Sequence, residues 1–221
     1  MTDYPVTLQI ADRLCLVVGG GAVGLRKARG LLEAGARVRL VSDTPPLHSP
    51  PKGTDLVLRP FRTEDLEGAF LAFAATDDPQ INAAVAEEAR RRGILVNVCD
   101  DPRKGDFHLP ALLRRDDLTV AVSTTGKSPA LAALARDRAG QVFGPEWGTV
   151  LEVFAAVRRK RLTHQKKNEY NQAILRRLLD SGLPGLIAAG NAADIDRLLE
   201  TLFGEGFSLT TLEVRMPKGT S

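Results

Sequence analysis

Short apolar runs without polar alternation recur over the first 122 residues of the chain. The first run is Leu14-Cys15-Leu16-Val17-Val18, a pattern typical of a strand buried on both faces of a parallel sheet. Helical segments lie between the runs at Ala22–Ala34 and Pro79–Arg92, each followed by glycine. This alternation predicts an α/β fold with a Rossmann-type parallel sheet and right-handed crossovers. The other predicted strands are 38–41, 56–58, 70–75, 94–98 and 118–122.

The strand signals end after residue 125, and the rest of the chain is predominantly helical in pattern. Ser128-Pro129 is an N-cap followed by a proline at the first helical position, and it opens a predicted helix that ends near Val142. The chain therefore has an α/β half and a C-terminal mostly helical region. The segment Phe207–Val214 fits either a terminal strand or a tail. Further helices are predicted over 147–161, 164–181 and 192–203.

The composition of the 221 residues is that of a globular protein, with 43% hydrophobic and 26% charged residues. No apolar run approaches the ~20 residues of a membrane span. The N-terminus lacks the basic and apolar regions of a signal peptide, so we expect a cytoplasmic protein with no membrane partner. The net charge of +3 allows an anionic ligand without requiring nucleic acid. Two cysteines and three scattered histidines predict neither a disulfide framework nor a protein-built metal site.

The glycine cluster after the first predicted strand fits the pattern GxGxxG and opens a helix, which is the context of a dinucleotide-binding loop. Gly19 permits a tight turn, Gly21 lets the backbone approach a pyrophosphate, and Gly24 permits close packing of helix on sheet. Asp43 lies just beyond the second strand, where an acid can accept hydrogen bonds from the adenine ribose. It favours NAD over NADP, although a solvated loop acid explains the residue nearly as well.

Three later strand ends carry further candidate chemistry, because ligands bind outside the carboxyl ends of parallel strands. Thr76 could line the nicotinamide side of a site, or could belong to a turn that caps the next helix. Asp100 and Asp101 are adjacent carboxylates, so one could have a raised pKa suited to a general base; the alternative is an Asp-rich turn. The segment 123–129 ends like a Walker A loop, but Ala121 stands where that loop needs glycine, which argues against a nucleoside triphosphate site.

These motifs, in this order and spacing, resemble the precorrin-2 dehydrogenase family, the N-terminal module of siroheme synthase. The resemblance extends from about Tyr4 to Trp147 and is carried by Gly-Gly-Gly-Ala-Val, Ala-Ala-Thr-Asp-Asp, Asn-Val-Cys-Asp-Asp-Pro and Val-Ser-Thr-Thr-Gly-Lys-Ser-Pro. It implies NAD-dependent oxidation of precorrin-2 to sirohydrochlorin by a homodimer. Many members also insert Fe²⁺, so Fe²⁺ or Co²⁺ is a further expected substrate. The implied parts are an NAD-binding Rossmann domain over 1–115, a connecting and dimerisation segment over 116–148, and a helical domain over 149–221.

The resemblance also implies roles for single residues. Asp100 matches the aspartate implicated in both family activities, and we expect it to be the catalytic base. His108 is either a second catalytic acid or base, or a half-buried loop histidine. Gly24 stands where many members have alanine, and we expect that exchange to cost nothing. The expected cofactor contacts are Gly19, Gly21, Ala22, Val23, Asp43, Thr44 and Thr76, and the expected contacts to the carboxylates of the tetrapyrrole substrate are Lys104, Ser123, Thr124, Lys127 and Ser128.

Two other function classes stay open at this point. The first is an NAD-sensing Rossmann module with a basic helical tail for partners or DNA, since basic residues cluster at 158–161 and 166–167. No recognition-helix signature accompanies them, so a nucleic-acid partner is not our expectation. The second is a different nicotinamide-dependent oxidoreductase.

Overall fold

The computed structural model describes residues 3–46, 48–163 and 172–216. The chain divides into two compact units, Met1–Leu109 and Pro110–Ser221, and each is described by itself. The predicted three-part division at residues 115 and 148 stays a prediction.

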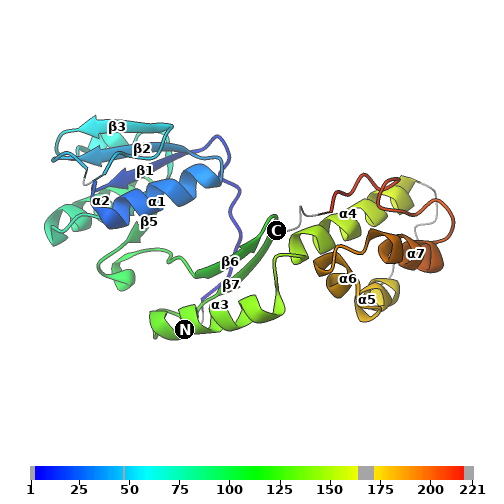
Figure 1. The fold of residues 1–221 in the computed structure, drawn as a ribbon. Coiled ribbons are helices and arrows are strands. Elements are labelled where there is room, and N and C mark those ends of the chain that lie inside the picture. The colour runs from blue at the N-terminus through cyan, green and yellow to red at the C-terminus, as the bar shows by residue number, and fades with distance from the viewer. Residues whose placement is uncertain (1–2, 47, 164–171, 217–221) are drawn as a thin grey trace. The chain divides into compact units, whose positions relative to one another are not determined.

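The first unit is built around a parallel sheet of five strands in the order β3-β2-β1-β4-β5 (Figure 1). This arrangement confirms the predicted Rossmann-type α/β fold. The strands are β1 (Leu14–Val18), β2 (Arg37–Ser42), β3 (Thr54–Leu58), β4 (Ala69–Ala74) and β5 (Leu95–Val98). The helices are α1 (Ala22–Glu33) and α2 (Pro79–Arg91), with two short 3-10 turns, η1 (Thr63–Leu66) and η2 (Pro102–Lys104).

The two faces of this sheet are covered by different elements, as the unalternating apolar strands require. On one face Cys15 and Val17 pack with Leu25 and Ala28 of α1. On the other face Leu16 and Val18 pack with apolar residues of α2 and with Leu66 of η1. Strands β1, β2 and β4 therefore contribute side chains to both cores, whereas β3 and β5 contribute to the second core alone.

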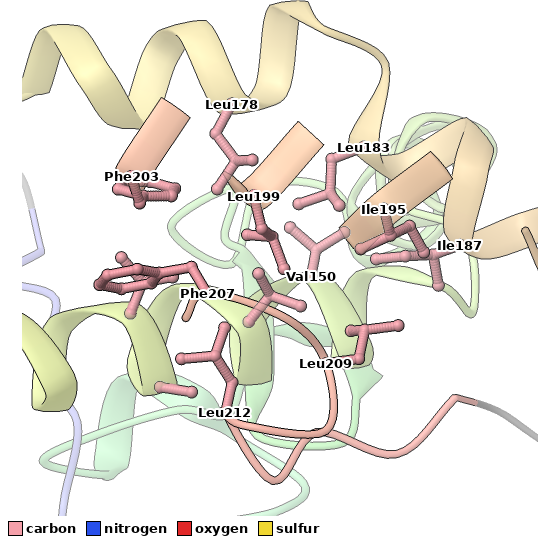
Figure 2. Close-up of a cluster of buried hydrophobic side chains, with 13 residues drawn as sticks. Val150, Leu178, Leu183, Ile187, Ile195, Leu199, Phe203, Phe207, Leu209 and Leu212 are labelled. Atoms are coloured by element: carbon pink, nitrogen blue, oxygen red, sulfur yellow. The ribbon is translucent and has the colours of Figure 1, made fainter. Parts of the chain in front are cut away.

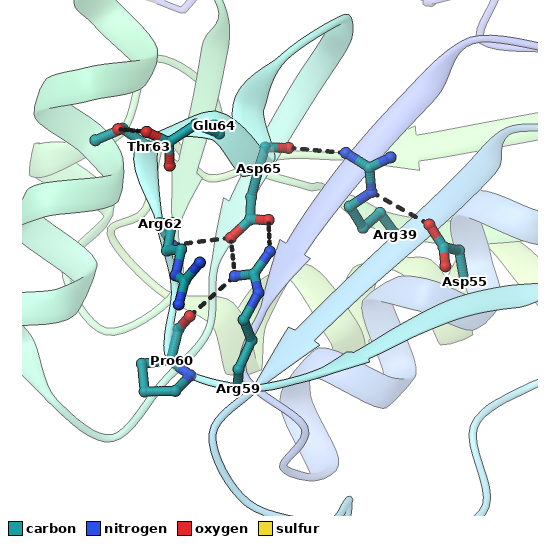
Figure 3. Close-up of polar contacts among 8 residues, drawn as sticks. All are labelled: Arg39, Asp55, Arg59, Pro60, Arg62, Thr63, Glu64 and Asp65. Carbon is teal, nitrogen blue, oxygen red and sulfur yellow. Dashed lines mark hydrogen bonds and ion pairs between the residues drawn. The ribbon is translucent and has the colours of Figure 1, made fainter.

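An ion pair with a buried carboxylate holds the crossover from β3 to β4 in place (Figure 3). The carboxylate of Asp65 accepts two hydrogen bonds from Arg59, at 2.6 and 2.8 Å, and one from the Arg62 N–H at 2.8 Å. Burial by itself would raise the pKa of Asp65, but the bonds from Arg59 and Arg62 hold it below its usual range. Arg39 of β2 also donates to the Asp65 carbonyl, so this short turn is held to the sheet.

The second unit begins with a hairpin rather than with a sixth parallel strand. Strand β7 (Leu118–Val122) pairs antiparallel with β6 (Ala111–Arg115), and α3 (Pro129–Val142) packs on both. The expectation that 118–122 would extend the parallel series was wrong, and β6 was missed. The two-residue turn at Asp116-Asp117, with Asp116 in the left-handed region, is the hairpin signal that was overlooked.

Four helices and the C-terminal segment form the other core of the second unit (Figure 2). Leu199 and Ile195 of one helix meet Leu178 and Leu183 of its neighbours, all fully buried. The C-terminal segment contains turns, not a strand, and it buries Phe207 against this cluster. The helical C-terminal region is thus confirmed, while the part of the predicted helix over 164–171 lies outside the described residues. The helices are α4 (Trp147–Thr163), α5 (Gln172–Asp180), α6 (Leu183–Ala188) and α7 (Ala192–Phe203).

Within the described ranges, no helix has both the length and the apolar character needed to span a membrane.

Candidate active site

The carboxyl ends of β1, β2, β4 and β5 lie at one edge of the first unit's sheet, because the strands are parallel. The chain runs outward from β1 to β2 and β3 on one side, and from β4 to β5 on the other. The order therefore reverses between β1 and β4, and such a switch point is where open α/β sheets bind their ligands.

The glycine loop after β1 is packed against the end of β4 without room for side chains. Gly19 has a φ of +116°, and a Cβ on it would lie 2.4 Å from the carbonyl oxygen of Ala75. A Cβ on Gly24 would lie 1.9 Å from the carbonyl oxygen of Gly19. The expectation that alanine costs nothing at position 24 was therefore wrong for this chain, because the obstructing atom belongs to the backbone of the same loop.

The first turn of α1 offers an open anion-binding end. Gly21 is the N-cap, it has no side-chain cap, and no atom lies within 4 Å of where its Cβ would be. The first helical hydrogen bond runs from the Leu25 N–H to the Gly21 carbonyl, so the N–H groups of the preceding turn have no acceptor in the helix. Gly21, Ala22 and Val23 are exposed. This end of the helix fits a pyrophosphate, as expected for a dinucleotide.

The turn after β2 lies against the same loop. Strand β2 continues through Ser42, so Asp43 follows the strand directly. The buried Ser42 hydroxyl donates to the Thr44 carbonyl at 2.7 Å, and a Cβ on Gly20 would lie 2.6 Å from that hydroxyl oxygen. Asp43 and Thr44 are exposed beside the loop, where the predicted ribose contact would need them.

Thr76, at the end of β4, makes its polar contacts with its own turn and with Asn82. Its hydroxyl lies 2.8 Å from the Asn82 side-chain oxygen and 3.0 Å from the Asp78 carbonyl oxygen. Asn82 is only 1% exposed and sits on the buried side of α2. Sequence reasoning missed Asn82, although a polar residue in the apolar stripe of a helix is the signal that could have found it.

The loop that follows β5 is anchored back onto that strand. The buried Asn97 donates to the Phe107 carbonyl at 2.8 Å, and the Phe107 ring meets the Phe73 ring edge-on at 5.5 Å. Asp106 accepts from the Val96 N–H at 3.0 Å and pairs with Arg90 at 3.1 Å. Both ends of the segment that carries Asp100 are therefore fixed. Asn97 and Asp106 were not among the predicted site residues.

The two adjacent aspartates of this loop differ in their surroundings. Asp101 accepts the backbone N–H of Arg103 at 3.1 Å and its guanidinium at 3.0 and 3.2 Å. These bonds lower the pKa of Asp101, which contradicts a raised pKa at this member of the pair. Asp100 is exposed and has no hydrogen bond or ion pair to another described residue. The geometry thus separates a structural carboxylate from an available one.

Lys27 of α1 lies close enough to Cys99 for the two charges to interact. Burial lowers the pKa of Lys27, and the nearby Cys99 opposes that shift. Burial raises the pKa of Cys99, while Lys27 opposes the rise and the Asp100 charge adds to it. The half-buried Lys27 thus places a positive charge beside the end of β5, and sequence reasoning assigned it no role.

The remaining predicted residues of the first unit lie in or near the same loop. Lys104 is exposed at the end of η2. The His108 imidazole lies 3.1 Å from the carboxylate of Asp3, at ion-pair distance. This contact is what the interpretation of His108 as a half-buried loop histidine would expect. A catalytic role for His108 stays a prediction.

The predicted substrate residues at 123–128 belong to the second unit, between β7 and α3. The Ser128 hydroxyl caps α3 by accepting the Leu131 N–H at 3.2 Å. The Thr124 hydroxyl donates to the Ser128 carbonyl at 3.0 Å, and the Ser123 hydroxyl accepts the Thr125 N–H at 3.2 Å. Lys127 is exposed. These hydroxyls shape the turn, and their contact with a substrate stays a prediction.

The basic cluster that suggested a nucleic-acid tail is partly engaged within the second unit. Lys160 donates to the Gly206 carbonyl and lies over the Phe207 ring, 4.9 Å from its centroid. Lys166 and Lys167 lie outside the described residues. No group of three or more His, Cys, Asp or Glu side chains in the described ranges could hold a metal ion.

Comparison with known proteins gives two family matches. A model described as a putative NAD(P)-binding domain matches residues 6–111. A second, described as the central part of a sirohaem biosynthesis protein, matches residues 115–138. The first covers the sheet with its glycine loop, and the second covers β7 and most of α3.

Curated relatives and a solved structure extend the likeness. "Siroheme synthase 1" of Aeromonas salmonicida (strain A449) is 36% identical over 92% of this chain and 45% of its own length. "Siroheme synthase" of Nitrosomonas europaea is 38% identical over 96% of this chain and 46% of its own length. The chain thus spans just under half the length of these relatives. The structure "SirC, precorrin-2 dehydrogenase" shares the fold, with a TM-score of 0.66 at 21% identity over 90% of this chain and 98% of that one.

Proposed function

Since the chain belongs to the siroheme synthase family, we propose that it catalyses the NAD-dependent dehydrogenation of precorrin-2 to sirohydrochlorin. The observation that carries the proposal is the available carboxylate of Asp100 at the same sheet edge as the glycine loop. The name of the similar SirC structure, a precorrin-2 dehydrogenase, is consistent with it.

The chain's own groups supply cofactor binding and proton transfer. The glycine loop and the first turn of α1, from Gly19 to Val23, would hold the pyrophosphate, and Asp43 would accept the ribose hydroxyls. An acid at that position disfavours a 2′-phosphate, so the proposed cofactor is NAD. NAD, when bound there, would supply the acceptor for the hydride removed from the substrate. Asp100 takes up the proton released in the same oxidation, so that precorrin-2 and NAD⁺ give sirohydrochlorin, NADH and H⁺.

The substrate is a polycarboxylate, which basic side chains would attract and hold. Lys104, with the loop Ser123–Ser128 of the second unit and its Lys127, is proposed to meet these carboxylates. Insertion of Fe²⁺ or Co²⁺ into sirohydrochlorin is a second part of the proposal. Two pyrrole protons are lost when the metal enters, and the carboxylate of Asp100 could accept them.

The proposed assembly is a homodimer in the cytoplasm, formed through β6, β7 and α3. In support, α3 leaves large apolar side chains in water: Leu131 is 57%, Leu134 66% and Val142 65% exposed. Ala132 is the one residue of α3 that is buried. Apolar faces of this kind mark protein contacts, and a second copy is the proposed occupant.

The experiment that tests the activity is anaerobic incubation with precorrin-2 and NAD, with NADH followed against a protein-free control. NADH that appears together with sirohydrochlorin supports the proposal. If the protein binds NAD but forms no NADH, the proposed cofactor site stands and precorrin-2 is contradicted as the substrate. A panel of other hydroxy and reduced substrates would then be tested. Addition of Fe²⁺ or Co²⁺ to the product then tests chelation.

The dimer is tested by sedimentation of the wild type and two charge-insertion variants. Leu134→Glu on α3 should convert a dimer to a particle of 23.8 kDa. Leu58→Glu is the matched control, because Leu58 is 55% exposed on β3 of the first unit, which is not part of the proposed interface. A wild type that sediments as a monomer contradicts the proposed assembly.

A further inference from the structure

The last residues of β4 leave the sheet beside the glycine loop. The Ala75 N–H donates to the Val18 carbonyl at 2.8 Å, and the Cys99 N–H donates to the Ala74 carbonyl at 2.9 Å. Beyond these bonds neither β1 nor β5 supplies a partner to Thr76. The Ala75–Thr76 peptide is nevertheless the surface against which Gly19 packs, since a Cβ on Gly19 would lie 2.9 Å from the Thr76 nitrogen.

The side chain of Asn82 takes the place of the missing strand. Its amide oxygen accepts the Thr76 N–H at 3.1 Å, and its amide nitrogen donates to the Thr76 carbonyl at 2.9 Å. The Thr76 hydroxyl donates to the same amide oxygen at 2.8 Å. Both backbone groups of Thr76 and its hydroxyl thus meet one side chain that is itself 1% exposed.

Burying a primary amide at this position lowers the stability of the fold unless the amide makes its hydrogen bonds. An apolar residue would fit the stripe that Val85 and Ala86 continue on α2, and burial of a polar group is offset only when its hydrogen bonds are made. The side-chain hydrogen bonds of Asn82 all go to Thr76. They do not join α2 to other helices, so their effect is local to the wall of the glycine loop.

We propose that Asn82 is a positioning residue for the dinucleotide, which acts by holding the Thr76 peptide against Gly19 and so fixes the width of the loop that receives the pyrophosphate. The inference rests on the proposed function, because it takes the glycine loop to be the NAD site. Asn82 itself need not touch the cofactor.

Titration of the full chain with NAD, in binding and in turnover, tests this role. Asn82→Leu, which keeps the branched shape of the side chain and removes the bonds, should raise the Kd and the KM for NAD about tenfold or more, with kcat at saturating NAD little changed. Thr76→Val removes the hydroxyl's contacts with Asn82 and with the Asp78 backbone but keeps both backbone bonds to Asn82, so it should raise both constants in the same direction by less. Thr76→Ser keeps the hydroxyl and should reverse most of the loss that Thr76→Val causes.

Val85→Ala is the matched control, because Val85 is fully buried one helical turn from Asn82 on the same face of α2 and packs in the apolar core there. It should lower Tm and leave the Kd for NAD within about twofold. A folded Asn82→Leu with a lowered Tm and an unchanged Kd would overturn the proposal. If Asn82→Leu does not fold, an unchanged Kd in Thr76→Val does so instead. A wild type that does not bind NAD would contradict the proposed function itself.

Discussion

The two units of the chain bury different kinds of side chain. Among the described residues, the first unit buries Ser42, Asp65, Asn82 and Asn97, whereas the buried polar residue of the second unit is Thr149. Each of the four in the first unit bonds a backbone group of a connecting segment. The core of the second unit in Figure 2 is apolar throughout.

This difference indicates that the buried side chains of the two units have different roles. Apolar packing stabilises a fold without fixing any one loop, because it has no direction. Hydrogen bonds from buried side chains are directional, and they fix individual loops. The first unit places them at the connections around the carboxyl edge of its sheet, where small displacements would alter a binding site.

The largest expected effect is a loss of packing in the second unit. Leu199→Ala removes a fully buried side chain from the cluster and should cost about 2–5 kcal/mol in the free energy of unfolding of that unit. Urea unfolding measures the loss, with Glu200→Ala as a control, because Glu200 is exposed on the same helix, α7. The Kd for NAD should stay at the wild-type value. A parallel loss of NAD binding would contradict the division between the units.

Glycine substitutions probe the first unit at the backbone. Gly24→Ala should cost about 1–3 kcal/mol, because the new methyl group meets the Gly19 carbonyl and the loop must shift. Gly30→Ala on the same helix meets no atom within 4 Å and should be neutral or stabilising. Thermal unfolding and NAD titration of the pair check this. Equal stability of the two variants would contradict the close approach of Gly24 to the Gly19 carbonyl.

Acid should weaken the first unit before the second. Arg91 and Arg92 hold the pKa of Glu88 at about 2. Burial by itself would raise the pKa of Asp65, but the hydrogen bonds from Arg59 outweigh burial and leave this pKa below its usual value. Arg103 lowers the pKa of Asp101. Carboxyl groups with depressed pKa values stabilise the fold above their ordinary pKa, and this contribution is lost as the pH falls from about 4.5 towards 2. Hydrogen exchange at pH 7 and pH 3 measures each unit, and Glu88→Gln should reduce the acid sensitivity. Parallel loss of protection in both units would contradict this prediction.

The smallest effect concerns thiol reactivity in the first unit. Burial raises the pKa of Cys15 to about 11, and burial also raises the pKa of Cys99. At pH 8 the thiolate fraction of Cys15 is on the order of one in a thousand, so alkylation should be slow in the native chain and fast in urea. Mass spectrometry after iodoacetamide treatment reports both sites. Rapid native labelling of Cys15 would mean that β1 is less well covered than described.

The contrast between apolar packing and buried hydrogen bonds also explains which features the sequence could predict and which it could not. Unalternating apolar runs found the five parallel strands, and Gly19 to Gly24 found the loop, because these depend on local pattern and on glycine's missing Cβ. Strand β6 was missed because its pattern is half exposed and ends in arginines. Asn82 and Asn97 were missed because their partners, Thr76 and Phe107, are set by the tertiary fold. The different surroundings of Asp100 and Asp101 depend likewise on where Arg103 points.

The most direct test of the central claim compares those two neighbouring carboxylates in turnover of precorrin-2 with saturating NAD. Asp100→Asn should lower kcat by about 10²- to 10⁴-fold and leave the Kd for NAD unchanged, because it removes the base and not the cofactor loop. Asp101→Asn, which alters a carboxylate held by Arg103, should keep most of the activity. Equal activity of Asp100→Asn and the wild type would contradict the account.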